Sequence, residues 1–263
     1  MNLSGTWRFE STSKAQKIKN PILIAGLPGI GNVGKIVVDF LIEETKATKL
    51  YEISGHSMPN SVFVNENNLV ELPKIEMYHK KLKNGKELFL LTGDVQPIDE
   101  ESCYKFCEDL VAISQKHGVK EIITLGGIGL GEAPRKPKVY CTGNSKEMIA
   151  RYAKNSSINT KVYGVVGPIV GVSGLLIGVA EKQKISAISL LAETLGHPMF
   201  LGVKGAKEIL ALLDKRFDMK LDTKKLDKEI AALDKEMRVS EELSSKARKA
   251  GSKDPEQNQS YIG

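Results

Sequence analysis

Cysteine, aromatic residues and excess charge are all scarce in this chain of 263 residues. Three cysteines are too few for a disulfide framework and suit a reducing compartment, so we expect a cytoplasmic protein. The formal charge of +6 is too small to predict nucleic-acid binding, and the aromatic residues, 6% of the chain, are not interleaved with basic runs. Hydrophobic residues make up 41%, which is enough for a sizeable core.

Long hydrophobic runs are also rare. The first apolar run, Ile22 to Ala25, is too short for the core of a signal peptide. Val162 to Ala180 has nineteen residues without a charge, close to the roughly twenty that a membrane helix needs. Its five glycines and its proline indicate instead a short buried strand over 162–166 and a helix from Ser173 to Glu181. We therefore expect no membrane association.

Motifs for catalysis and metal binding are missing as well, since the chain has no CxxC, HExxH or G-x-S-x-G. The four-residue spacing of Cys103 and Cys107 indicates buried small side chains on one helix face, and Cys141 stands alone. The four histidines share no metal-ligand spacing: His56, His79, His117 and His197. Three carboxylates on separate segments are candidates for an acid–base set, although solvated or capping roles are more usual: Asp94, Glu132 and Glu193.

Apolar strand-like runs alternate with amphipathic segments from Pro21 onward, which predicts an α/β fold with a mixed, mostly parallel sheet. The expected strands are 22–25, 49–53, 87–91 and 119–125. The expected helices are 32–44, 99–117, 146–153 and 206–217. Shorter strands, predicted to be antiparallel, cover 61–64, 69–72 and 75–82. The segment 187–193 is ambiguous between helix and loop.

The composition divides the chain into four parts: a flexible segment over 1–19, an α/β domain over 20–217, a charged helix over 218–250 and a disordered tail over 251–263. The charged helix carries a partial heptad pattern at Met219, Leu226, Ile230, Leu233 and Met237. This pattern predicts that the helix packs on the domain or pairs with a second chain.

A glycine motif follows the first predicted strand. Gly29, Gly31 and Gly34 match G-x-G-x-x-G, which binds dinucleotides when it opens a helix. Against that interpretation, Glu52 lies inside the second strand rather than at its end. The same stretch is one residue short of a phosphate-binding loop, and Ile36 replaces the hydroxyl that would hold magnesium. The alternative is geometric, because glycines permit a tight turn and close packing of helix on sheet.

Two further glycine clusters, 126–131 and 167–174, follow predicted strands. If the strands are parallel, their carboxyl ends gather the three clusters at one edge of the sheet, where doubly wound folds bind ligands. That edge could hold a nucleotide or nucleoside, or it could present close-packed backbone to a neighbouring subunit. The residues concerned, for ligand binding or for loop geometry, are Gly29, Gly31, Asn32, Gly34, Gly126 and Gly127.

Seven short motifs occur in the order found in one known family. They are Leu27–Gly34, Ser57–Pro59, Leu91–Pro97, His117–Val119, Thr124–Gly127, Ile169–Leu176 and Glu193–Thr194. On these motifs the chain resembles the archaeal proteasome assembly chaperone family over about residues 20–215. The resemblance implies a three-layer α/β sandwich similar to nucleoside phosphorylases, which the charged helix predicted over 218–250 would extend at the C-terminal side. It also implies self-association, binding to proteasome α subunits, no established catalysis and no cofactor.

Family members that engage the proteasome end in a hydrophobic residue, a tyrosine and any residue, which enter pockets between α subunits. In this chain Tyr261 is followed by Ile262 and Gly263 and is preceded by Ser260. The resemblance therefore implies that Tyr261, Ile262 and Gly263 contact proteasome α subunits during or after ring assembly.

Overall fold

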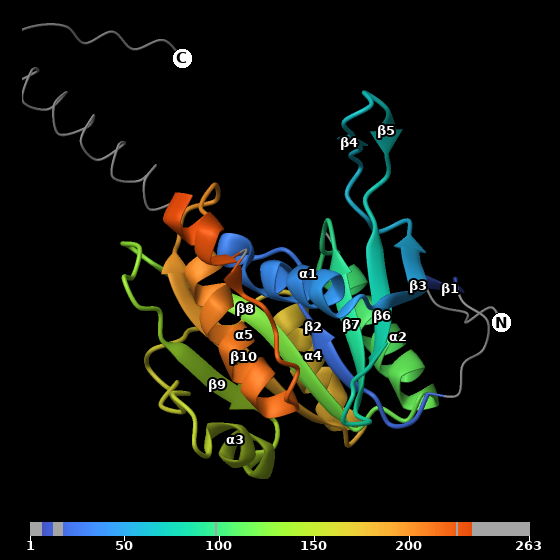
Figure 1. Ribbon diagram of the computed structural model, residues 1–263. Coiled ribbons are helices and arrows are strands. Elements are labelled where there is room, and N and C mark those ends of the chain that lie inside the picture. Colours follow the sequence, from blue (N-terminus) through green and yellow to red (C-terminus); the bar gives the residue numbers. More distant parts are fainter. Residues whose placement is uncertain (1–6, 13–17, 98, 225, 233–263) are drawn as a thin grey trace, which may run out of the picture. The chain divides into compact units, whose positions relative to one another are not determined.

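The computed structural model describes residues 7–12, 18–97, 99–224 and 226–232. The chain divides into two compact units, Met1–Asp222 and Thr223–Gly263. In the second unit, residues 224 and 226–232 are helical. The first unit holds the sheet and its helices (Figure 1).

An eight-stranded sheet forms the centre of the first unit, in the order β1-β3-β6-β7-β2-β8-β10-β9. The four strands β7, β2, β8 and β10 are parallel, and every other neighbouring pair is antiparallel. Three of the seven pairings in this sheet, as far as it is described, are therefore parallel, so a mixed sheet is confirmed but a mostly parallel one is wrong. The strands are β1 (Trp7–Ser11), β2 (Ile22–Ala25), β3 (Thr48–Gly55), β6 (Ile75–Lys81), β7 (Glu87–Gly93), β8 (Glu121–Leu130), β9 (Val139–Gly143) and β10 (Ser186–Leu195).

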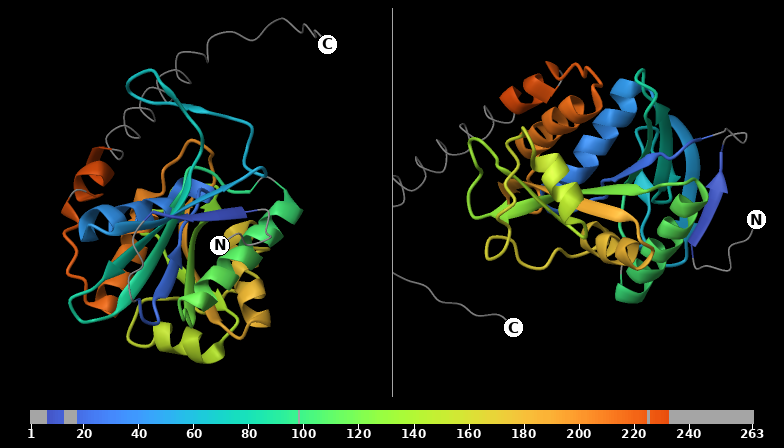
Figure 2. Two further views of the ribbon diagram at one scale, coloured as in Figure 1. Left: turned by 90° about the vertical axis from the view of Figure 1, so that its right-hand side faces the viewer. Right: turned by 90° about the horizontal axis from the view of Figure 1, so that it is seen from below.

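Helices cover both faces of this sheet, which confirms the three-layer α/β architecture (Figure 2). One face carries α1 (Val33–Thr45) and α5 (Val203–Phe217), and the other carries α2 (Glu100–Lys116) and α4 (Val172–Lys182). A shorter helix, α3 (Lys146–Ala153), packs against β9 and β10. Because the central strands are covered on both sides, they are apolar along their length, and all seven residues of β7 are buried.

The first strand corrects the expectation of a flexible segment over 1–19, which is wrong for residues 7–11. Trp7 is completely buried, and its indole N–H donates to the backbone oxygen of Ser102, 3.2 Å away. Its ring lies 5.0 Å from that of Phe106 in an edge-on arrangement. Trp7 therefore anchors this edge strand, together with Phe9, whose ring lies 6.2 Å from that of Tyr51.

Between β9 and α4 the prediction of a buried strand over 162–166 is also wrong. Residues 163–165 form a turn, and the N–H groups of Val165 and Val166 both donate to Val162. Gly164, the one glycine of 162–166, has a positive φ (+79°) that suits a turn rather than a strand, and the sheet positions go to β9 and to β10, which covers the ambiguous segment 187–193. The helix that follows begins at Val172, one residue before the expected cap. No helix among the described residues is long and apolar enough to cross a bilayer.

A hairpin of β4 (Phe63–Val64) and β5 (Val70–Glu71) leaves the sheet between β3 and β6. We call residues 60–73 the arm, which stands out from the body in Figures 1 and 2. Its turn is closed by Asn65, whose side-chain oxygen accepts from the N–H groups of Asn67 and Leu69, 3.0 Å away in each case. The predicted antiparallel hairpin over 61–72 is therefore confirmed.

The charged C-terminal helix does not begin at residue 218, because Asp218 adopts a left-handed conformation (φ +51°) that ends α5. The boundary between the two units lies at 222/223 rather than at 217/218. Leu233 and Met237 of the heptad pattern lie outside the described residues, as do Tyr261, Ile262 and Gly263.

Candidate functional site

The direction of the strands gathers the predicted glycine motifs at one edge of the sheet. β3, β7, β2, β8 and β10 all point the same way, because β3 and β7 are both antiparallel to β6. We call the edge where these strands end the carboxyl edge. It carries the arm and the loops 26–32, 131–138, 160–171 and 196–202.

The glycines of the turn that follows β2 are explained by the path of the backbone. Gly31 (φ +61°) and Asn32 (φ +50°) are left-handed, so the chain reverses within one short 3₁₀ turn, Ile30–Asn32, before α1 begins. The side-chain oxygen of Asn32 accepts from the N–H of Gly29 at 3.4 Å, within its own turn. The carbonyl of Gly31 accepts from Gly202 at 2.7 Å, which joins this turn to the loop 196–202.

Two of the glycines place backbone against backbone where a side chain would not fit. A Cβ atom at Gly34 would lie 2.5 Å from the carbonyl oxygen of Leu125. A Cβ atom at Gly127 would lie 2.3 Å from the carbonyl oxygen of Ile30. Gly126 and Gly127 lie inside β8, which extends to Leu130, so the expected turn directly after residue 125 is wrong. The contacts favour the geometric interpretation of these glycines over ligand binding.

A cavity of about 370 Å³ lies beside this turn, between β8 and the loop 160–171. None of its lining residues is charged, and most are apolar. Its two polar side chains, Gln96 and Ser173, are engaged elsewhere: Gln96 accepts from the N–H of Val172 at 3.0 Å and donates to Pro28, and Ser173 donates to Leu125 at 3.2 Å. The cavity therefore offers no side chain that would bind the phosphates of a nucleotide.

The three candidate carboxylates do not meet. Asp94 accepts from the backbone N–H of Lys74 at 3.0 Å, and Glu193 accepts from the hydroxyl of Tyr140 at 3.0 Å. Asp94 follows β7 and Glu193 lies in β10, so three strand spacings, about 14 Å, separate their positions in the sheet. Glu132 is exposed in the loop after β8. These residues form no acid–base set, because Asp94 and Glu193 lie far apart and each accepts a hydrogen bond from another part of the fold.

The cysteines and histidines are dispersed over the described structure. Burial of Cys103 and Cys107 is confirmed. Cys141 is buried as well, which raises the pKa of its thiol to about 12. His79 contacts Glu87 at 3.0 Å and His117 contacts the hydroxyl of Tyr51 at 2.8 Å, whereas the other two histidines are exposed. Within the described ranges, no three potential ligands come close enough to bind a metal ion.

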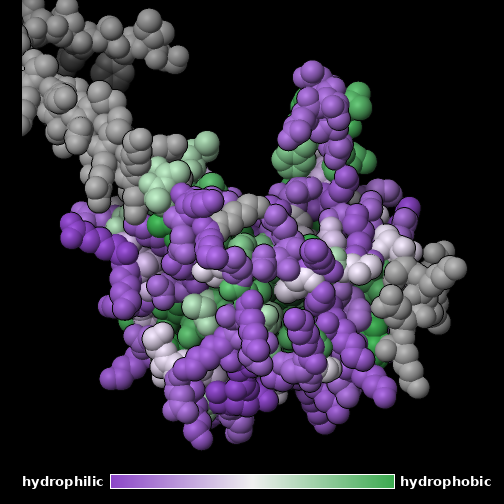
Figure 3. All heavy atoms as spheres, viewed as in Figure 1, coloured by the Kyte–Doolittle hydropathy of each residue, from purple (hydrophilic) through white to green (hydrophobic). Residues whose placement is uncertain are grey.

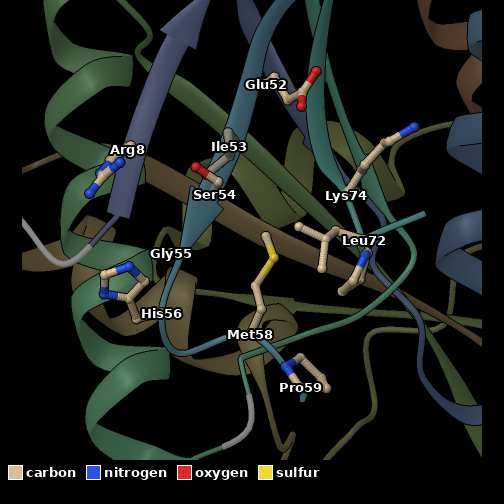
Figure 4. A pocket seen from close by; sticks show the side chains of 11 residues that line it. Arg8, Glu52, Ile53, Ser54, Gly55, His56, Met58, Pro59, Leu72 and Lys74 are labelled. Atoms are coloured by element: carbon tan, nitrogen blue, oxygen red, sulfur yellow. The ribbon is translucent and has the colours of Figure 1, made fainter. Parts of the chain in front are cut away.

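A second cavity, of about 510 Å³, opens at the base of the arm. Figure 4 shows Met58 projecting into its middle, with Arg8 and His56 on one side and Lys74 on the other. Glu52 also lines it, so the surrounding charges have both signs and do not select a ligand of one charge. The cavity is lined both by residues of β3 and by Leu72, the last exposed apolar residue of the arm.

Exposed apolar side chains are concentrated at the carboxyl edge. Of thirteen large hydrophobic residues exposed in the described structure, twelve lie on this edge and only Tyr104 lies elsewhere, on α2. Six are on the arm and six are on the loops. Figure 3 shows green, hydrophobic atoms among the purple ones of the arm. Apolar surface gathered in this way is typical of a protein–protein interface. The residues are Val62, Phe63, Val64, Leu69, Val70 and Leu72 on the arm, and Ile30, Tyr163, Val165, Val170, Met199 and Leu201 on the loops.

The sequence analysis identified the arm as a hairpin but missed this apolar surface. The available signal was two runs of consecutive apolar residues, 62–64 and 69–70, since consecutive residues of a strand face opposite sides. β4 and β5 are each only two residues long and pair only with each other. A two-stranded hairpin has no second layer in which to bury such residues.

Comparison with known proteins identifies the family, since residues 23–240 match the model of the PAC2 family. This chain belongs to the PAC2 family. It is 29% identical to the uncharacterized protein MJ1210 of Methanocaldococcus jannaschii over 250 residues, 94% of each chain. It is also 29% identical to PbaB of Pyrococcus furiosus, described as an archaeal proteasome activator, with a TM-score of 0.82 over 90% of this chain and 99% of PbaB.

A third match adds support for the fold of this PAC2 protein. PbaA of Pyrococcus furiosus, described as an archaeal homolog of proteasome-assembly chaperone, superposes with a TM-score of 0.73 at 22% identity, covering 93% of this chain and 95% of PbaA. Together these matches confirm the family resemblance and the α/β fold inferred from the seven motifs.

Proposed function

We propose that this PAC2 protein binds proteasome α subunits and assists the assembly or capping of the 20S particle, without catalysing a reaction. The observation that carries the proposal is the likeness to PbaB, at 29% identity and a TM-score of 0.82 over nearly the whole chain. The apolar carboxyl edge supports it, because such an edge provides contact surface for a protein rather than groups for a chemical step.

Nucleotide or nucleoside binding, the alternative raised by the glycine motifs, receives less support. The cavity beside the glycine turn lacks charged side chains. Gly34 and Gly127 are required for backbone packing, and the side chain of Asn32 bonds within its own turn. These contacts explain the motif without a ligand.

The C-terminal residues Tyr261, Ile262 and Gly263 are the proposed contact with the α subunits. An aromatic and an aliphatic side chain that follow a polar segment can enter a pocket on a partner. Ordering such a segment on binding costs conformational entropy, which lowers the net affinity of each tail. Several tails on one assembly would bind more tightly through multivalency. We place this activity in the cytoplasm, a reducing compartment that suits three unpaired cysteines.

The test is retention of the protein by immobilised proteasome α rings. Removal of residues 260–263 should lower retention about tenfold or more, because each tail contributes to a multivalent contact. The matched control replaces Gln257 and Asn258 by alanine in the full-length chain and should bind as the wild type does. Undiminished retention of the truncated chain would contradict the role of the tail. Failure of the full-length chain to bind would contradict the proposed function as a whole.

A further inference from the structure

We propose that a pocket between α3 and α5 binds a phosphate group, carried by a small molecule or present as the free ion. The pocket has a volume of about 160 Å³. It is lined by the ends of the two helices, by the loop that follows α3 and by Leu190 of β10. None of these residues belongs to the apolar carboxyl edge, so the proposal is independent of the proposed function.

Positive charge distinguishes this pocket. Four cations line it, and no acidic residue of the described chain does: Arg151, Lys154, Lys215 and Arg216. Arg151 is in an ion pair with Glu121, the first residue of β8. Within the described ranges, the other three cations are in no ion pair. Three uncompensated positive charges around one small pocket attract anions and raise their local concentration.

Two of these cations are held in place by other groups of the fold. The guanidinium of Arg216 lies over the ring of Tyr152, 4.6 Å from its centroid. Tyr152 is buried, and its hydroxyl donates to Glu121. The ammonium of Lys215 donates to the backbone oxygen of Asn155 at 2.8 Å. Both cations keep further N–H groups for a ligand, and side chains that are already ordered lose less entropy on binding.

Helix ends explain why cations are found here, but they do not neutralise the pocket. Arg151 lies in the last turn of α3, and Lys215 and Arg216 lie in the last turn of α5. Cations are favoured at these positions because a helix carries about half a negative charge at its carboxyl end. Two such ends supply roughly one negative charge, which is less than the charge of the three unpaired cations. The pocket therefore stays positive.

Charge and size favour phosphate over other common anions. A phosphate monoester carries about −1.5 to −2 charges at pH 7 and has three strong acceptor oxygens, which suits three cations better than a singly charged carboxylate does. Aliphatic side chains beside the cations lower the local dielectric constant and strengthen charge-assisted hydrogen bonds. The volume is below the roughly 300–1,000 Å³ of pockets that enclose a whole ligand, so this pocket suits a single anionic group. The aliphatic lining residues are Ile158, Leu190, Leu212 and Leu213.

Isothermal titration calorimetry of the full chain with inorganic phosphate, at a constant ionic strength of about 0.1 M, tests the site. We expect one phosphate per chain with a Kd of about 1 mM. The variant Lys154→Gln/Arg216→Gln should bind at least tenfold more weakly, because two charge-assisted hydrogen bonds are lost. The matched control Arg135→Gln/Lys136→Gln removes the same two charges from an exposed loop of the carboxyl edge and should bind as the wild type does.

Asn155→Asp gives a sharper test, because it adds a negative charge to the lining without changing the shape of the side chain. Asn155 is exposed and left-handed (φ +56°), a conformation that aspartate tolerates. The new carboxylate should repel phosphate and weaken binding about tenfold. Asn68→Asp is the matched control, because Asn68 is also exposed and left-handed (φ +61°) but lies on the arm. It should leave the affinity unchanged, and both variants should melt close to the wild type.

Titration with glycerol 3-phosphate identifies the source of the phosphate group. Tighter binding of the ester than of free phosphate assigns the pocket to a phosphorylated small molecule, and equal or weaker binding assigns it to the free ion. Acetate should bind at least tenfold more weakly than either, and equal binding of acetate would contradict the choice of phosphate.

Three further results would overturn the proposal. They are the absence of binding by both phosphate compounds, undiminished binding by the variant Lys154→Gln/Arg216→Gln, and equal weakening by the control Arg135→Gln/Lys136→Gln, which would indicate a general attraction to a basic protein. Because none of these measurements includes proteasome subunits, the proposal fails or survives separately from the proposed function.

Discussion

The two edges of the same sheet differ sharply in the residues that they expose. We call the edge where β3, β7, β8 and β10 begin the amino edge, with its loops 46–47, 82–86, 117–120 and 183–185. None of the thirteen exposed large hydrophobic residues of the described structure lies there, whereas twelve lie on the carboxyl edge. The amino edge instead exposes lysines: Lys46, Lys83, Lys86, Lys120 and Lys184. Because both edges belong to one sheet, the difference comes from the loops and not from the fold.

The loops of the two edges also differ in length. Those of the amino edge are short turns closed by backbone hydrogen bonds, such as the one from Gly118 to Gln115 at 2.9 Å and the one from Ile185 to Ala180 at 3.0 Å. The carboxyl edge has the arm and the loop 160–171, which are longer than most connections in compact domains. Long surface loops on a rigid sheet are where binding residues are usually found, so the comparison favours the carboxyl edge over the amino edge as the place of recognition.

The largest effect is expected from Trp7, which lies beneath the base of the arm. Trp7→Ala removes a completely buried ring, its contact with Phe106 and its hydrogen bond to Ser102. Unfolding in urea should show a loss of about 3–5 kcal/mol. The same strand supplies a control in Arg8, whose side chain is exposed, so that Arg8→Ala should change stability by less than about 0.5 kcal/mol. If Trp7→Ala lowered the free energy of unfolding as little as Arg8→Ala does, β1 would not support the carboxyl edge.

A smaller effect is expected from the glycines of the carboxyl edge. Gly127→Ala places a Cβ atom against the carbonyl of Ile30, and the shift needed to relieve it should cost about 1–3 kcal/mol in urea unfolding. Gly131 has open space around it, so Gly131→Ala should be close to neutral. If a ligand rather than packing required glycine at 127, the alanine variant would keep its stability.

Much of the fold could be predicted from the sequence, because periodicity and caps mark elements that are buried on one face. The predicted strand over 22–25 and helix over 146–153 coincide with β2 and α3. Prediction failed at the sheet margins, at β1 and β9, where short strands depend on neighbours distant in the sequence. It also failed at 162–166, where an apolar run is an exposed turn at the carboxyl edge. The three glycine clusters do gather at one edge as predicted, although Gly126 and Gly127 lie inside β8 rather than after it. Exposure of apolar residues is a tertiary property, which the sequence did not reveal.

The smallest effect on stability is expected at the amino edge, from His117. This side chain lies just after α2, where its Nε2 is 2.8 Å from the hydroxyl of Tyr51 and its ring is 5.1 Å from that of Phe89. Burial, with a smaller contribution from the charge of nearby His79, lowers the pKa of His117 in the folded state. At a pH well above about 6.5, the pKa of a histidine in the unfolded chain, His117 is neutral in both states and does not change the free energy of unfolding.

As the pH falls below that value, the unfolded chain binds the proton first, so the free energy of unfolding decreases until the pH reaches the lowered pKa of the folded state. The slope from this one group is at most about 1.4 kcal/mol per pH unit. His117→Gln keeps a polar partner for Tyr51 but cannot titrate, so urea unfolding between pH 7.5 and 5.5 should show a shallower loss of stability than in the wild type. Parallel slopes for wild type and His117→Gln would mean that the acid sensitivity of the fold arises elsewhere.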